Sequence, residues 1–189
     1  MEALLLSTGV IFLAELGDKS QLMALTFATR FRARTVLLGI TIATAIVHAA
    51  SVLIGAVMGN SLPTGVISVL AGVAFLAFAA WTLRGDALTE EEKSKAEQAT
   101  GSALLAVGLA FFLAELGDKT MLATITLATD NGLFGTWVGS TIGMVLADAL
   151  AIAAGLWLGR QLPEKTVKYG AAAAFAVFGI LLILDGLTS

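Results

Sequence analysis

The sequence of 189 residues has no cysteine, a single histidine and few charged residues. Without cysteine there can be no disulfide, no thiolate metal site and no cysteine nucleophile. No serine–histidine or metal–histidine constellation accompanies the acidic residues, so we do not expect an enzyme. The net charge of −3 indicates no nucleic-acid partner. Charged residues make up 13% of the chain, against about a quarter of an average soluble protein.

Apolar residues dominate instead, at 58% of the sequence. This composition predicts an all-α polytopic membrane protein whose main partner is the lipid bilayer. A membrane-spanning helix needs about 20 predominantly apolar residues. Six stretches meet this requirement: 3–27, 35–58, 65–83, 103–129, 134–158 and 167–187. The first should be retained as a span, because the N-terminus lacks the basic start of a signal peptide.

The second half of the sequence repeats the first. Phe-Leu-Ala-Glu-Leu-Gly-Asp-Lys occurs at 12–19 and again at 112–119, and Leu-Pro at 62–63 recurs at 162–163. We therefore divide the chain into repeat 1 (1–83), an acidic cytoplasmic linker (84–102) and repeat 2 (103–189). Three helices per repeat is an odd number, which predicts six transmembrane helices arranged as two inverted-topology three-helix repeats.

Loop charges predict the orientation. With the N-terminus outside, all the loop lysines and arginines fall on the inner side, as the positive-inside rule requires. These residues are Arg30, Arg32, Arg34, Arg84, Lys93, Lys95, Arg160, Lys165 and Lys168. We expect both termini outside. The short N-terminus favours a prokaryotic cytoplasmic membrane over an organelle.

Each copy of the octet places two acids and a lysine inside an apolar span. A charge at the centre of a membrane helix costs about 2.5 to 3.5 kcal/mol on insertion scales, so such groups face a protein interior or a water-filled path. Their spacing predicts that Glu15, Asp18 and Lys19 share one face of a helix. Gly17 and Gly117 are points where the backbone can approach a neighbour or open locally.

The acids of the two octets are candidate ligands for a metal ion. If the first and fourth helices run in opposite directions, their motifs meet near mid-membrane. An oxygen-rich cluster suits Mg²⁺, Ca²⁺ or Mn²⁺. With the two lysines the cluster carries a charge of −2, which one divalent ion or two protons would neutralise. These observations predict exchange of a divalent cation for protons. The predicted metal ligands are Glu15, Asp18, Glu115 and Asp118.

Two features of the motifs have alternative interpretations. Lys19 and Lys119 either balance the charge of the empty site as tethered counter-ions or point away and snorkel. Alternatively, each motif neutralises itself through an intrahelical Glu–Lys pair and serves only packing.

Several neighbouring polar residues are secondary candidates. Gln21 is either an additional ligand or a packing amide, and its repeat mate is Met121. Ser20 and Thr120 are either ligands or, the interpretation we favour, donors to the backbone of the preceding turn. His48 and Asp148 are repeat mates in mid-span, which suggests a proton relay or a gate between the halves. The alternative for His48 is a satisfied core side chain.

The sequences Glu-Leu-Gly-Asp-Lys-Ser (15–20) and Glu-Leu-Gly-Asp-Lys-Thr (115–120) resemble the paired signatures of uncharacterised protein family 0016. That family includes a Golgi manganese transporter, yeast and plastid relatives, and bacterial manganese exporters. The resemblance covers essentially the whole chain. It implies a secondary transporter that exports Mn²⁺, in some members Ca²⁺, against protons, with the ion held by the Glu and Asp of each motif. No cofactor is implied beyond the transported ion.

Two other transport functions stay open at this stage. Export of a small organic cation or amino acid would use the same acidic site. A passive cation channel would also share it, although lysines in its filter would hinder cation flow. The inverted symmetry predicts a transport path, with alternating access around the central four-carboxylate site, rather than one-sided catalysis. The oligomeric state is open, with a homo-oligomer as one option.

Overall fold

A computed structural model describes residues 1–59, 61, 63–84, 102–158 and 164–188. Within these ranges the chain is helical and contains no strand. The helices are α1 (Glu2–Glu15), α2 (Lys19–Arg30), α3 (Ala33–Gly59), α4 (Thr64–Arg84), α6 (Ala103–Glu115), α7 (Lys119–Asp130), α8 (Leu133–Leu158) and α9 (Glu164–Thr188). Nearly all of the expected acidic linker lies outside the described residues. The chain is therefore an all-α protein, as its composition predicts.

Two of the six predicted spans are not continuous helices. The stretch 3–27 is divided between α1 and α2, and 103–129 is divided between α6 and α7. Glu15 and Glu115 end the first helix of each pair, and Lys19 and Lys119 begin the second. The prediction that Glu15, Asp18 and Lys19 share one face of a helix is therefore wrong. The local opening expected at the glycines is what occurs.

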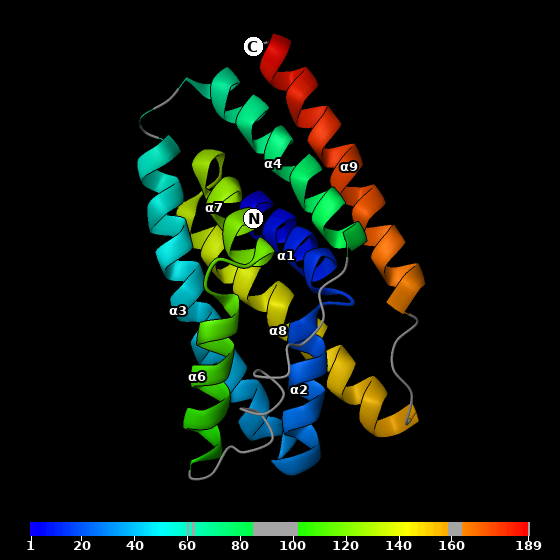
Figure 1. The fold of residues 1–189 in the computed structure, drawn as a ribbon. Coiled ribbons are helices and arrows are strands. Elements are labelled where there is room, and N and C mark those ends of the chain that lie inside the picture. The colour runs from blue at the N-terminus through cyan, green and yellow to red at the C-terminus, as the bar shows by residue number, and fades with distance from the viewer. Residues whose placement is uncertain (60, 62, 85–101, 159–163, 189) are drawn as a thin grey trace.

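The two halves of the chain pack against each other. Helix α1 packs on α8 and α2 also contacts α8, while their repeat mates α6 and α7 both pack on α3. Figure 1 shows α1 and α2 running downward from the middle of the view, whereas α6 and α7 run upward from its bottom. The breaks in the two helix pairs lie at a similar height in this view. The predicted six-span inverted topology is compatible with this arrangement.

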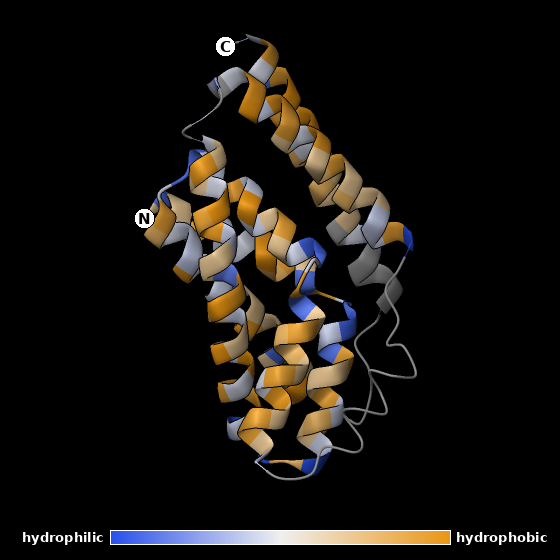
Figure 2. Cartoon of the chain, turned by 60° about the vertical axis from the view of Figure 1, so that its left-hand side comes forward, coloured by the Kyte–Doolittle hydropathy of each residue, from blue (hydrophilic) through white to orange (hydrophobic). Residues whose placement is uncertain are grey.

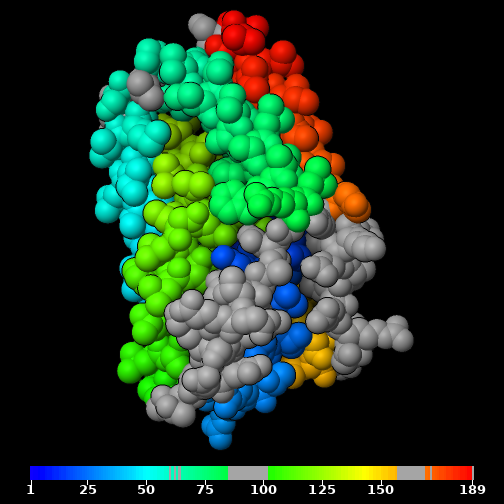
Figure 3. Space-filling model, in the orientation of Figure 1, coloured from blue at the N-terminus to red at the C-terminus, as the bar shows by residue number. Residues whose placement is uncertain are grey.

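Helices α4 and α9 form a separate antiparallel pair at one side of this core (Figures 1 and 3). The pair meets the core where α4 contacts α7 and α9 contacts α1. Phe75 and Phe78 of α4 and Phe175 of α9 belong to one buried apolar cluster with residues of α1 and α7. The ring centroid of Phe75 lies 5.9 Å from those of both Phe78 and Phe175. The junction is thus an apolar contact between two helical layers.

Many large apolar side chains are exposed on the outer surface, as expected for a protein surrounded by lipid. Large side chains such as Leu5, Leu53, Leu105 and Leu109 are more than half exposed. Three described helices are individually long and apolar enough to cross a membrane, namely 33–59, 65–84 and 133–156. In Figure 2, most of the helical ribbon has the colours of hydrophobic residues. Since polar groups are buried inside, the chain is a multi-pass membrane protein.

Glycines allow the halves to approach closely. A Cβ atom on Gly139 of α8 would lie 2.4 Å from the carbonyl oxygen of Leu4 in α1. In the other half, a Cβ atom on Gly55 of α3 would lie 2.4 Å from the carbonyl oxygen of Ile125 in α7. Close packing of membrane helices through small residues brings the broken helices against α3 and α8.

Candidate functional site

Each motif forms a short extended break between two helices. In the first, Leu16 (φ −62°, ψ 122°) and Asp18 (φ −85°, ψ 164°) are extended, and Gly17 between them has φ 76°. In the second, Gly117 has φ 78°. These are the only two residues with positive φ in the part of the chain that the structure describes. A residue with a Cβ atom pays about 1 to 2 kcal/mol in this region, so glycine permits the break.

The break exposes helix ends to the interior of the protein. Asp18 precedes the first turn of α2, and Asp118 precedes that of α7. The N-terminal end of a helix carries a partial positive charge that favours a carboxylate placed there. Broken helices of this kind form ion sites in many transporters. The motif sequence therefore builds two carboxylate-bearing helix ends within the protein core.

Each motif lysine pairs with the aspartate of the other motif. Lys119 Nζ donates to Asp18 Oδ1, and Lys19 Nζ lies 3.8 Å from Asp118 Oδ1. The Lys119 side chain is 5% exposed, against 18% for Lys19. This arrangement contradicts the alternative in which each motif neutralises itself. It also rules out, for Lys119, a side chain that snorkels to the interface.

The two motif glutamates are fully or almost fully buried. Glu15 is 0% and Glu115 1% exposed, and the two carboxyl groups interact electrostatically. Ser20 donates a hydrogen bond to Glu15, and Thr120 Oγ1 donates one to Glu115 Oε2 at 2.7 Å. Our expectation that these two hydroxyls bond to the preceding backbone is wrong, because each lies in the first turn after the break and donates to the glutamate of its own motif instead.

The four predicted ligands thus belong to one cluster, in which the two aspartates are paired with lysines. Across the described residues, no three histidine, aspartate or glutamate side chains are placed to hold a metal ion as they stand. One oxygen of Glu15 and one of Glu115 are buried without a hydrogen-bond partner. Buried oxygens without a donor are unusual and require an explanation, such as a proton or an ion. The chemistry of the donor set, carboxylates and hydroxyls, fits a hard divalent cation.

Gln21 supports the first break rather than extending into the acidic cluster. Its Oε1 accepts a hydrogen bond from Gly17 N, and its Nε2 donates one to the carbonyl oxygen of Ala147 in α8, both at 2.9 Å. In the second motif, Gly117 N instead donates to the sulfur of Met121 at 3.2 Å. A thioether has no donor. The first break is consequently tied to α8 through its amide side chain, and the second has no such tie through Met121.

His48 and Asp148 are both completely buried but do not bond to each other. His48 Nδ1 lies 3.4 Å from Thr141 Oγ1, and its Nε2 has no hydrogen-bond partner. Both carboxylate oxygens of Asp148 also lack a partner. Asp148 interacts electrostatically with Asp18. Both residues can be recognised in the sequence as polar groups in the middle of apolar spans. Their equivalence in the repeat does not indicate that Asp148 lies near the acids of the motifs.

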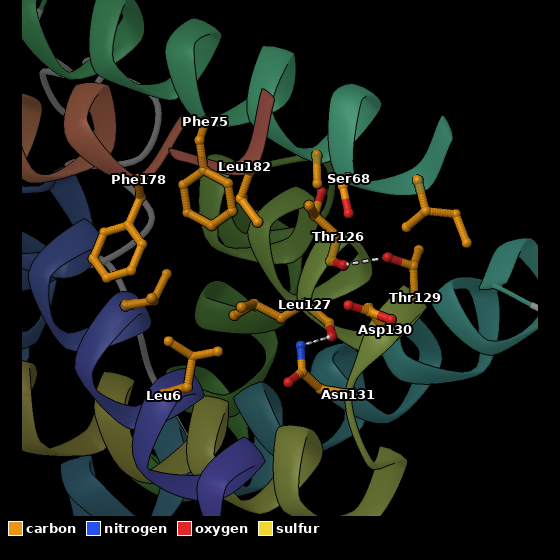
Figure 4. Close-up of a pocket in the computed structure, with 13 residues that line it drawn as sticks. Leu6, Ser68, Phe75, Thr126, Leu127, Thr129, Asp130, Asn131, Phe178 and Leu182 are labelled. Carbon is orange, nitrogen blue, oxygen red and sulfur yellow. Dashed lines mark hydrogen bonds between the residues drawn. The ribbon is translucent and has the colours of Figure 1, made fainter. Parts of the chain in front are cut away.

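A cavity of about 120 Å³ lies elsewhere, between α1, α4, α7 and α9 (Figure 4). Phe75 and Phe178 line its apolar wall, and Thr126, Asp130 and Asn131 line a polar wall at the end of α7. None of the motif residues lines this cavity. It is therefore distinct from the acidic cluster.

Comparison with known proteins gives a family for the whole described fold. The family model described as "Divalent cation/proton antiporter GDT1" matches residues 3–90 and 103–189. A protein of Vibrio cholerae serotype O1 described as "Putative manganese exporter" is 32% identical over 95% of this chain and 90% of its own length. A GDT1-like protein of Synechocystis is 30% identical over 91% of this chain and 92% of its own.

A plant relative matches a smaller share of its own length. The rice protein described as "GDT1-like protein 2, chloroplastic" is 32% identical over 90% of this chain and 58% of its own. No solved structure matches the chain. The two matched ranges coincide with the two sequence repeats and include both motifs.

Proposed function

Because the chain belongs to the GDT1 family of divalent cation/proton antiporters, we propose that it exports Mn²⁺ from the cytoplasm in exchange for protons. The ion site is formed by the four motif carboxylates Glu15, Asp18, Glu115 and Asp118. Ca²⁺ is a second substrate of the same oxygen-rich site. The chain is a transporter and not an enzyme.

The observation that carries this proposal is the crossed pairing of the two motifs. Lys119 reaches Asp18 and Lys19 reaches Asp118, although the partners lie about one repeat apart in sequence. The crossed pairs place charged groups of both halves in one buried cluster. A site shared by two halves that move relative to each other can open first to one side and then to the other.

The lysines serve as counter-ions that an arriving cation replaces. The four motif carboxylates and the two ammonium groups together carry a charge of −2, which one divalent ion or two protons neutralise. When Mn²⁺ binds, Asp18 and Asp118 exchange their lysine partners for the metal. Mutual repulsion between the acids favours protonation once the metal has left. Cation and protons therefore compete for one set of oxygens, which is the requirement for exchange.

The membrane arrangement follows the inverted repeat. Each repeat contributes a broken helix and two continuous helices, and the six resulting spans place both termini outside the cytoplasmic membrane. Alternating access arises from movement of one repeat against the other around the cluster. In this scheme His48 and Asp148 lie on the continuous helices α3 and α8 that face the breaks, where a proton relay or a gate would act.

Transport in reconstituted proteoliposomes tests the proposal. Vesicles that contain the protein and a Mn²⁺-sensitive dye should take up Mn²⁺ when the lumen is acidic and should acidify the medium as they do so. Glu15→Gln and Glu115→Gln should abolish both fluxes, while the exposed carboxylate variant Asp185→Asn should retain them. Mn²⁺ uptake that is independent of the pH gradient would contradict exchange. Uptake of an organic cation or amino acid without competition by Mn²⁺ would contradict the substrate.

A further inference from the structure

Asp148 is a buried carboxylate that the motif chemistry does not use. It lies in α8, is 0% exposed, and neither of its oxygens has a hydrogen-bond partner. The other acids of the cluster have protein partners. Asp18 pairs with Lys119, while Glu15 and Glu115 accept hydrogen bonds from hydroxyl groups. A buried charge without a partner is strongly unfavourable, so its position within a membrane helix indicates a functional role.

The contacts of α8 direct Asp148 towards the two motifs. Gln21 Nε2 binds the carbonyl oxygen of Ala147 at 2.9 Å, which fixes the residue before Asp148 against the first turn of α2. Asp148 interacts electrostatically with Asp18, and both Glu15 and Glu115 include it among their charged neighbours. Asp148 therefore lies in the field of acids from both repeats.

His48, the repeat mate, does not neutralise Asp148. The imidazole has Thr141 as its hydrogen-bonding neighbour through Nδ1, and its Nε2 is not bonded to the carboxylate. The two mates thus place different chemistry on the two continuous helices, an acid on α8 and an imidazole on α3. Since Mn²⁺ and Ca²⁺ prefer carboxylate oxygen to imidazole nitrogen, the α8 side offers the better ligand.

We propose that Asp148 is a fifth carboxylate of the transport site and supplies an oxygen to the transported divalent cation. This inference rests on the proposed function. It adds to the family motifs a ligand from a helix that lies outside them and has no equivalent acid in the other repeat. With Asp148 the charge of the empty site is −3, and one divalent ion or two protons bring it to the same value of −1, so the exchange of one for the other is unchanged. The bound cation is accordingly held on the side of α2 and α8, where Gln21 ties the first break to the residue next to Asp148.

A role of Asp148 in binding and a role in packing predict different effects of its replacement. A residue kept for packing loses stability when it is replaced. A buried carboxylate whose role is to bind a cation destabilises the metal-free protein. Asp148→Asn should therefore leave the apo protein at least as stable as the wild type. The same change should weaken the stabilisation by Mn²⁺, because a ligand that binds only the folded state stabilises it in proportion to its affinity.

The experiment measures thermal unfolding of the full chain in detergent during titration with Mn²⁺. For Asp148→Asn we expect an apo Tm no lower than that of the wild type and an apparent Kd for Mn²⁺ raised by about tenfold or more, since changes in the shell around a metal site already cost 10- to 100-fold. Asp185→Asn, in the exposed carboxylate of α9 to which Ser68 donates a hydrogen bond, is the matched control and should bind like the wild type.

The outcomes distinguish this inference from the function on which it rests. An apparent Kd for Asp148→Asn within about twofold of the wild type would overturn the inference, as would a lower apo Tm with unchanged Mn²⁺ affinity. If Asp148→Asn does not fold, Asp148→Ser is judged by the same Kd criterion. Absence of Mn²⁺ stabilisation in the wild type, or full stabilisation in Glu15→Gln, would instead contradict the proposed function.

Discussion

Replacement of Lys119 by methionine should destabilise the empty protein much more than the same replacement of Lys19. The Lys119 side chain is 5% exposed and its partner Asp18 is 0% exposed, so Lys119→Met leaves a buried carboxylate without its cation. Breaking a buried ion pair in this way costs about 3 to 5 kcal/mol. The pair of Lys19 with Asp118 is longer, at 3.8 Å, and Lys19 is 18% exposed. Asp118 is also buried, but the longer separation and the partly exposed ammonium make this pair weaker, so we expect its loss to cost less than the loss of the Lys119 pair.

Thermal unfolding of the two purified variants measures this difference. With about 2 to 4 °C per kcal/mol for a chain of this size, Lys119→Met should lower Tm by about 6 to 20 °C. Lys19→Met should lower Tm by less. Addition of Mn²⁺ should recover much of the loss in Lys119→Met, because the metal replaces the ammonium as the partner of Asp18. The same variant should hold Mn²⁺ more tightly than the wild type and release it more slowly.

Two results would refute this reasoning. Equal destabilisation by the two replacements would show that burial of the Lys119 pair has no energetic consequence. Failure of saturating Mn²⁺ to stabilise Lys119→Met more than the wild type would show that metal and lysine do not compete for the same carboxylate.

Further predictions concern the breaks and the continuous helices. Gly17→Ala and Gly117→Ala force a Cβ atom into positive φ at about 1 to 2 kcal/mol each, and proteoliposome assays should show reduced Mn²⁺ transport in both, whereas Gly9→Ala should transport normally. Gln21→Met removes the hydrogen bond to α8 and should lower the maximal transport rate in the same assay. Met121→Gln adds a donor and should not lower this rate. A large loss of rate for Met121→Gln alone would contradict a role for the hydrogen bond between Gln21 and α8. His48→Ala should slow proton-coupled export across about pH 6 to 8, and a normal pH profile would exclude the relay.

The repeat made the convergence of the motifs predictable. Two copies of one octet in an odd-numbered set of helices must point in opposite directions if both cross the membrane, so their acids can meet. The structure places Glu15 and Glu115 in one buried cluster with both lysines. The family resemblance, drawn from the same residues, is confirmed by the family model.

Local geometry at the motifs was not predictable from hydropathy. An apolar run of 25 residues looks the same whether it is one helix or two, and only Gly17 and Gly117 signal the positive φ that ends each helix. Once the helix is assumed to be continuous, Ser20 is directed to the backbone and Lys19 to the Glu of its own motif. The break reorients both side chains, which is why the crossed ion pairs and the Ser20 contact with Glu15 were missed.

Contacts between helices that are far apart in the sequence were also not predictable from it. The spacing of Gln21 within its motif does not reveal that Ala147 lies 2.9 Å from its amide nitrogen. The place of Asp148 beside the acids follows from the same packing of α8 on α2, and periodicity within either helix contains no information about it.

Anomalous scattering from Mn²⁺ in crystals of the full chain tests the central claim most directly. We predict one peak between the two helix breaks, with oxygens of both motifs at the distances of about 2.0 to 2.6 Å that hard divalent cations adopt, and with both lysines withdrawn from Asp18 and Asp118. A peak bound to one motif alone, or Mn²⁺ found only outside the cluster while the crossed lysine pairs persist, would contradict the account.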